Sequence, residues 1–190
     1  MANLPPLSPI VARWEAWEGA NAGLEHLELR PEGDGFVASG IVIGSNEAVH
    51  FGLRYRLLID AGWHIRDALL ETGAGARVRL DSDGRGHWRR DGCDCASLDG
   101  CIDIDVEATP FTNTLPIRRL GLTTGEGRVV RLAYVLIPSL EVVPRSQRYT
   151  AVDAARLYRF ESLERSFTAD LPLDEDGLVG DYPGLFRRVL

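Results

Sequence analysis

Alternation of apolar and polar residues constrains the fold of this chain more than any other feature of its sequence. Phe51, Leu53, Tyr55, Leu57 and Ile59 place an apolar side chain at every second position. A period of two is typical of a β-strand that buries one face and exposes the other. Because such a strand needs a second layer to cover its apolar face, the pattern predicts a fold built from sheets.

The same alternation recurs along the chain and predicts many further strands. Near the N-terminus it places Glu25, Leu27 and Leu29 on one strand face, with His26 on the other. Further strands are predicted at residues 36–43, 63–71, 77–81, 87–90, 102–107, 129–137, 140–143, 147–152, 158–162, 167–173 and 179–182. The pattern of residues 63–71 would also allow a short helix.

Turn residues separate these segments at short intervals and favour an antiparallel meander. Asp-Gly pairs occur at residues 34–35, 83–84, 91–92, 99–100 and 176–177, and both residue types suit tight turns. Only residues 114–120 have a helical pattern, with residues 151–157 as an ambiguous second candidate. The sequence therefore predicts one all-β domain over residues 1–190, in a single sheet that rolls or closes on itself. The proline-rich residues 1–10 are expected to be loosely ordered.

Charge and composition exclude several classes of function. The net charge is −7, which disfavours nucleic acid as a partner, and all 21 basic residues are arginine, which excludes lysine-based catalysis. Three cysteines and four scattered histidines form no metal-binding motif, and no glycine-rich nucleotide loop precedes a helix, so we expect neither a metal nor a cofactor. With no signal peptide and no long apolar run, the chain is expected to be cytoplasmic and to lack a transmembrane segment.

A row of carboxylates is the most unusual chemical feature. Asp103, Asp105 and Glu107 alternate with apolar residues, so they share one face of a strand at intervals of about 7 Å. Carboxylates this close repel one another unless water, a metal ion or arginine compensates their charge. Three interpretations follow: a solvated face with cross-strand ion pairs, the wall of a polar cavity, or a calcium or magnesium site.

Short polar side chains follow directly after this row. Thr112, Asn113 and Thr114 precede the predicted helical turn, where Thr114 would be a good N-cap. Alternatively, these side chains form a polar rim that binds sugar hydroxyls or a head-group. Arg118 or Arg119 would then bind a phosphate or carboxylate group.

Several longer motifs resemble those of a known family of small bacterial proteins, named "Putative glycolipid-binding". They are LDGCIDID at residues 98–105, ATPFTNTLPIRRL at 108–120, QRY at 147–149, YRFES at 158–162 and DYPGLFR at 181–187. The resemblance covers nearly the whole chain. It implies a spiral β-roll, in which one long antiparallel sheet curls into a half-open barrel. It also implies a fold similar to that of the lipoprotein localisation factors, which shelter acyl chains.

The resemblance implies a glycolipid or another amphiphile as the partner, and it carries over no catalytic residue. The residues matching its densest motifs, with three polar residues from other motifs, form the candidate ligand site: Arg66, Asp99, Asp103, Asp105, Thr109, Thr112, Asn113, Arg118, Arg119, Gln147 and Tyr149.

Three functions are compatible with these observations. The first is a binding protein whose apolar cavity holds an amphiphile, with the polar cluster near the cavity mouth. The second is an enzyme acting on a carbohydrate or lipid head-group through Asp103, Asp105 or Glu107. The third is an interaction module without a small ligand, which pairs through an exposed sheet edge. The oligomeric state is left open by the sequence.

Overall fold

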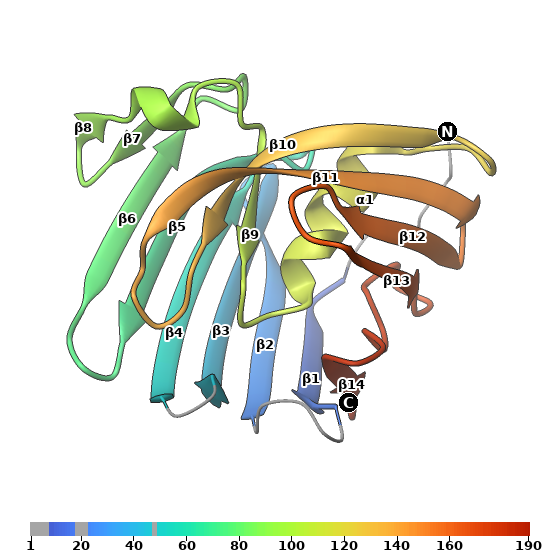
Figure 1. The fold of residues 1–190 in the computed structure, drawn as a ribbon, viewed down its shortest axis with the longest axis horizontal. Helices are drawn as coiled ribbons and strands as arrows, with labels where there is room; N and C mark the ends of the chain where they lie inside the picture. The colour runs from blue at the N-terminus through green and yellow to red at the C-terminus, as the bar shows by residue number, and fades with distance from the viewer. Residues whose placement is uncertain (1–7, 18–22, 47–48) are drawn as a thin grey trace.

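The computed structural model describes residues 8–17, 23–46 and 49–190 and shows an almost entirely β architecture (Figure 1). The strands are β1 Ile10–Ala16, β2 Gly23–Glu32, β3 Gly35–Asn46, β4 Val49–Ile59, β5 Ile65–Thr72, β6 Arg77–Ser82, β7 Trp88–Arg90, β8 Cys93–Asp94, β9 Asp103–Val106, β10 Gly127–Val135, β11 Val142–Asp153, β12 Leu157–Ser162, β13 Phe167–Pro172 and β14 Phe186–Arg188. The helical elements are the 3₁₀ turns η1 Ala96–Leu98 and η2 Phe111–Asn113, and the α-helix α1 Thr114–Leu120.

One long curved sheet contains nine strands in the order β14-β1-β2-β3-β4-β5-β6-β7-β8. All its pairings are antiparallel. The order follows the chain except at β14, which returns to pair with β1. Its outermost strands, β14 and β8, are not hydrogen-bonded to each other in the described residues, so the sheet is not closed. The all-β prediction is confirmed, including the long curled antiparallel sheet.

A second sheet of five strands, β13-β12-β11-β10-β9, covers the first (Figure 1). The sequence predicted a single sheet, and this detail is wrong. β9 pairs with β10 in parallel, which requires a crossover that returns the chain to the end of the sheet where it began. The segment containing η2 and α1 makes that crossover, and it interrupts the meander.

The helix lies between the two sheets and separates two apolar cores. Leu115 packs into the core of the long sheet, around Trp14, Leu57 and Trp88. Ile117 packs into the core of the smaller sheet. The two positions lie about 200° apart around a helix, so α1 contributes an apolar side chain to each core.

The predicted helical turn at residues 114–120 is confirmed, but its start differs from the prediction. Asn113 precedes the helix and makes no side-chain capping hydrogen bond. The Thr114 hydroxyl instead accepts a hydrogen bond from the backbone N–H of Val179, at 3.4 Å. The helix ends at Gly121, whose positive φ of 53° is typical of a C-terminal cap. None of the helices in the described part of the chain has the length and apolar character needed to cross a membrane.

Two further segments differ from the predicted strands. The strands expected at residues 140–143 and 147–152 form one strand, β11, although Pro144 lacks an N–H donor. Pro144 pairs with β10, whereas the pairing of β11 with β12 begins only at Gln147. At Pro144, β11 is therefore paired with a strand on one side only, and a proline is tolerated at such an edge position. The strand expected at residues 179–182 is reduced to isolated bridges at Val179 and Tyr182.

The ends of the chain form strands that the alternation did not reveal. The expected loose segment covers residues 1–10, of which residues 1–7 lie outside the described residues. Ile10 already begins β1. Trp14 of β1 pairs with Arg188 of β14, and the Arg188 guanidinium lies 4.7 Å from the centre of the Trp14 ring.

Candidate ligand-binding site

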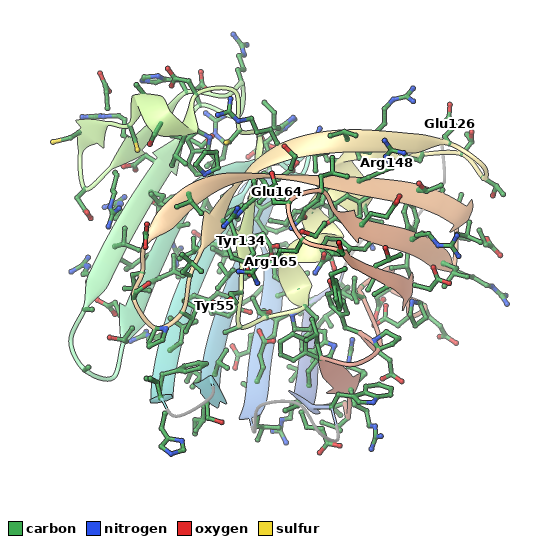
Figure 2. The ribbon with its side chains drawn as sticks, viewed as in Figure 1. Tyr55, Glu126, Tyr134, Arg148, Glu164 and Arg165 are labelled. Atoms are coloured by element: carbon green, nitrogen blue, oxygen red, sulfur yellow. The ribbon has the colours of Figure 1, made fainter. Side chains whose placement is uncertain are left out.

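Two adjoining cavities lie between the sheets. One, about 330 Å³, is lined by Trp14 and is called the Trp14 cavity below. The other, about 210 Å³, is lined by Phe160, Phe167 and Tyr182 and is called the aromatic cavity. Both are lined by the same five residues at their junction, which are Glu107, Tyr134, Arg165, Leu185 and Phe186. Figure 2 shows Tyr134 and Arg165 close together in the middle of the molecule, where the two cavities meet. The two cavities therefore adjoin, and together they are called the groove below.

Aromatic rings make one wall of the aromatic cavity. The centre of the Phe160 ring lies 5.6 Å from that of Tyr149, 6.1 Å from that of Phe167 and 5.9 Å from that of Tyr182. The rings meet at steep angles, as aromatic pairs prefer. Polar and charged side chains line the same cavity: Asp105, Glu107, Thr109, Asn113, Arg145, Gln147, Ser162 and Arg165. Such a cavity offers an apolar platform with both hydrogen-bond donors and acceptors beside it.

A buried hydrogen-bond network holds the polar wall of this cavity in place. Asp105 accepts hydrogen bonds from the Thr112 hydroxyl at 2.8 Å and from the Gln147 amide at 2.6 Å. The Tyr149 hydroxyl lies 2.8 Å from Asn113 Oδ1 and 2.9 Å from Gln147 Oε1, and it donates its proton to one of them. Burial raises the pKa of Asp105, and the bonds from Gln147 and Thr112 offset part of that rise.

This network contains five of the eleven site residues that the sequence proposed. Asp105, Thr112, Asn113, Gln147 and Tyr149 belong to it directly. Thr109 lines the same cavity, and its hydroxyl accepts a hydrogen bond from the Phe111 N–H at 3.0 Å.

Asp103 and Arg119 form a separate buried ion pair that lines neither cavity. Arg119 donates from Nε to Oδ1 at 2.9 Å and from Nη2 to Oδ2 at 2.6 Å. The side chain of Asp103 is 1% exposed and that of Arg119 is 15% exposed. Burial raises the pKa of Asp103, while Arg119 lowers it. The geometry gives this pair a role in holding α1 against β9.

The remaining site candidates lie away from the groove. Arg118 donates to the carbonyl oxygen of Asp176 and stacks on the Trp63 ring, 4.7 Å from its centre. Arg66 donates to the carbonyl oxygen of Asp83. Asp99 is exposed, with its carboxylate 3.8 Å from His87. None of the three lines either cavity.

The acidic row on and just after β9 is buried at Asp103 and half-buried at Asp105 and Glu107, so its interpretation as a solvated strand face is wrong. Asp103 is fully buried, and Asp105 and Glu107 line the aromatic cavity. A carboxylate oxygen of Glu107 accepts a hydrogen bond from the Ile137 N–H at 3.0 Å. Among the described residues, no three His, Cys, Asp or Glu side chains cluster closely enough to hold a metal ion. The interpretation as the wall of a polar cavity describes Asp105 and Glu107 best.

Glu25 is a site residue that the sequence analysis did not select. It is 1% exposed, and it lies on the concave face of β2 together with Leu27 and Leu29. Tyr55 donates a hydrogen bond to its Oε1, and the Thr109 hydroxyl also interacts with its carboxylate. Burial raises the pKa of Glu25 to about 7. The sequence could have indicated Glu25, because a carboxylate on an otherwise apolar strand face is unusual.

The other groove residues could not be recognised from their local sequence. Tyr134 comes from β10, Arg145 from β11, and Arg165 from the turn between β12 and β13. Burial, followed by the nearby charge of Asp105, raises the pKa of Tyr134. These side chains converge only when the two sheets face each other.

A glycine on the neighbouring strand makes room for the contact between Tyr55 and Glu25. Gly40 lies between them on β3, opposite Tyr55 in the β3–β4 register. A Cβ at position 40 would overlap the Tyr55 ring and its hydroxyl. The absence of a side chain therefore lets Tyr55 lie across β3 and reach Glu25 on β2.

We expect Gly40→Ala to lower the free energy of unfolding by about 1–3 kcal/mol, because overpacking forces side chains and backbone to shift. Urea denaturation would measure this change. Gly52→Ala on β4 is the matched control, since an added Cβ there meets no atom within 4 Å. The control should be unchanged or more stable by up to about 1 kcal/mol. Equal stabilities of the two variants would contradict the proposed role of Gly40.

Comparison with known proteins assigns the chain to a family. Residues 11–188 match the family described as "Putative glycolipid-binding". The chain belongs to this family. The family that the sequence motifs suggested is therefore confirmed, and membership supports a binding function. No curated protein matches the chain.

Two crystal structures are similar to this member of the "Putative glycolipid-binding" family. A DUF1089 family protein from Pseudomonas aeruginosa is 41% identical, with a TM-score of 0.79, over 100% of this chain and 97% of that one. A β-barrel-like DUF1849 protein from Brucella abortus is 13% identical, with a TM-score of 0.51, over 96% of each chain. The second similarity shows the fold alone.

Proposed function

We propose that the protein binds an amphiphile in the groove between its two sheets, with a sugar head-group in the aromatic cavity and an apolar chain in the Trp14 cavity. The observation that carries this proposal is that the two adjoining cavities share five lining residues, while the aromatic cavity adds the aromatic rings and several amide, carboxylate and guanidinium groups. An aromatic platform beside carboxylate, amide and guanidinium groups suits a ring that carries both C–H faces and hydroxyls.

Apolar residues make the Trp14 cavity suitable for the chain of the ligand. Its lining includes Val42, Phe51, Ile137 and Leu185 as well as Trp14. Contact with such side chains removes apolar surface from water, which contributes roughly 25 cal/mol for each Å² buried.

A hollow at the rim of the long sheet continues the Trp14 cavity outward. Leu24, Phe51 and neighbouring glycines line both. The hollow is also lined by exposed apolar side chains, with Leu24 at 49%, Ile43 at 67% and Val49 at 50% exposure. Exposed apolar side chains next to a cavity often mark where a ligand enters, and an acyl chain would meet few polar groups on this route.

n-Octyl β-D-glucoside, used below its micelle concentration, tests the proposal because it joins one sugar to one short chain. We expect saturable binding at one site, measured by isothermal titration calorimetry. Ser162 lines the aromatic cavity, so Ser162→Tyr should fill it and weaken binding by about tenfold or more, equivalent to about 1.4 kcal/mol.

Ser166→Tyr is the matched control, because Ser166 is exposed and lines neither cavity. It should change the dissociation constant by less than about twofold. Circular dichroism would verify that both variants are folded. Glucoside binding that Ser162→Tyr leaves unchanged would exclude the aromatic cavity as the head-group site.

A further inference from the structure

Glu25 brings a buried carboxyl group to the part of the Trp14 cavity wall that strands β1, β2 and β3 form. It lies beside Trp14 in the β1–β2 register and beside Val42 in the β2–β3 register, and all three line the Trp14 cavity. Leu27 and Leu29, which continue the same strand face, are buried in the apolar core. A carboxyl group on this otherwise apolar strand face is unusual and calls for an explanation.

One oxygen of this carboxyl group has no hydrogen-bond partner of suitable distance and angle in the described structure, although the Thr109 hydroxyl lies near the carboxylate. Tyr55 donates to Oε1, whereas Oε2 is buried without a partner in the described structure. An unmet buried acceptor costs about 1–3 kcal/mol, and more when it is charged. A ligand group that donates to Oε2 would recover that cost.

The charged and titratable groups around Glu25 indicate which donor is suitable. Tyr55 and Thr109 interact with its carboxylate directly, and Arg188 of β14 attracts its negative charge. Glu107, Tyr134 and Arg165 line the same cavity. Since Arg188 and Arg165 already supply positive charge, and since burying an ammonium group among apolar side chains is expensive, a neutral hydroxyl is the better donor.

We propose that Glu25 forms a hydroxyl-accepting subsite in the Trp14 cavity, so that the preferred ligand carries a hydroxyl group on its apolar part. This inference rests on the proposed function, because it assigns the apolar part of the amphiphile to the Trp14 cavity. It adds the chemical class of that part, which is an alcohol rather than a plain hydrocarbon chain.

Two isomeric probes separate hydrogen bonding from apolar burial. 1-Hexanol and 1-methoxypentane have the same atoms, but only the alcohol can donate a hydrogen bond. We expect wild-type protein at about pH 8.5, where Glu25 is ionised, to bind the alcohol about tenfold more tightly than the ether. Titrations followed by ¹⁵N NMR give the affinities, and a shift of the Trp14 indole signal locates each probe in this cavity.

Glu25→Gln tests the acceptor directly. When Tyr55 donates to the amide oxygen, the amide NH₂ replaces Oε2, so a donor stands where the acceptor was. The preference for the alcohol should fall to about twofold or less. Lowering the pH to about 5.5 protonates Glu25 in the wild-type protein and should also reduce the preference, without any substitution.

The outcomes distinguish this inference from the proposed function. Equal binding of both probes with a Trp14 shift, or a preference that survives in Glu25→Gln, would overturn the hydroxyl subsite and leave chain binding intact. If octyl glucoside binds but neither probe shifts the Trp14 signal, the Trp14 cavity is not a subsite and the inference fails. If octyl glucoside does not bind either, the proposed function itself fails.

Discussion

Replacing Arg119 with methionine should lower the free energy of unfolding by about 3–5 kcal/mol, because it leaves the carboxylate of Asp103 buried without its partner. The Asp103 side chain is only 1% exposed, so water cannot replace the two hydrogen bonds from Arg119. Urea denaturation near neutral pH would measure the loss. The loss should be smaller in acid, where the unpaired Asp103 can take up a proton.

Two further variants separate the cost of an unpaired charge from the loss of an ion pair. Asp103→Leu combined with Arg119→Met removes both charges and should recover most of the stability. Arg159→Met breaks the exposed pair with Asp170, whose side chains are 49% and 46% exposed, and should cost less than about 1 kcal/mol. A loss in Arg119→Met no larger than that in Arg159→Met would refute the buried ion pair.

Glu25 should make the protein less stable as the pH rises, which is the opposite of the usual behaviour of a carboxyl group. Its pKa rises from 4.5 to about 7 on folding because the group is buried. Between these values the unfolded chain has lost the proton that the folded chain still holds. The contribution of Glu25 is therefore complete below about pH 4.5 and is lost as the pH passes 7, by about 3 kcal/mol in total.

Glu25→Gln removes this titration, so the variant should gain stability relative to wild type as the pH rises. Urea unfolding of both proteins at several pH values isolates the effect from other buried carboxyl groups. Glu28→Gln is the matched control, because the Glu28 side chain lies on the same strand and is 52% exposed. Its stability difference from wild type should vary by less than about 0.5 kcal/mol over the same range. A constant difference for Glu25→Gln would show that Glu25 ionises normally in the folded protein.

The sequence predicted most of the strands because the alternation of apolar and polar residues can be recognised within each strand separately. It could not predict the division into two sheets, since the parallel pairing of β9 with β10 depends on where α1 packs. Strand β14 has only three residues, Phe186–Arg188. A segment this short cannot show the alternation of apolar and polar residues. Two strands were predicted where β11 is continuous through Pro144, because the consequence of a missing N–H depends on which side of the strand has a neighbour.

The candidate site was predicted in part, for related reasons. Asp105, Thr112 and Asn113 come from one continuous motif, so their proximity was visible along the chain. Gln147 and Tyr149 came from the family resemblance, and the structure places them in the same network. Arg145 and Arg165 reach the groove through tertiary packing alone. Arg66, Asp99 and Arg118 belong to recognisable motifs, but their contacts lie elsewhere.

The short helix between the sheets accounts for the existence of a groove. Because α1 packs one apolar side chain into each core, it holds the two sheets apart where it lies between them. α1 has only seven residues and is about 10 Å long, whereas an eleven-residue strand such as β4 extends for about 36 Å. The helix therefore occupies only part of the space between the two sheets. The cavities are lined by residues just before the helix, namely Ala108, Thr109 and Asn113. The cavities therefore begin at the N-terminal end of α1. Under the proposed function, the length of this helix limits the room left for the ligand, so a relative with a longer helix should accept a smaller molecule.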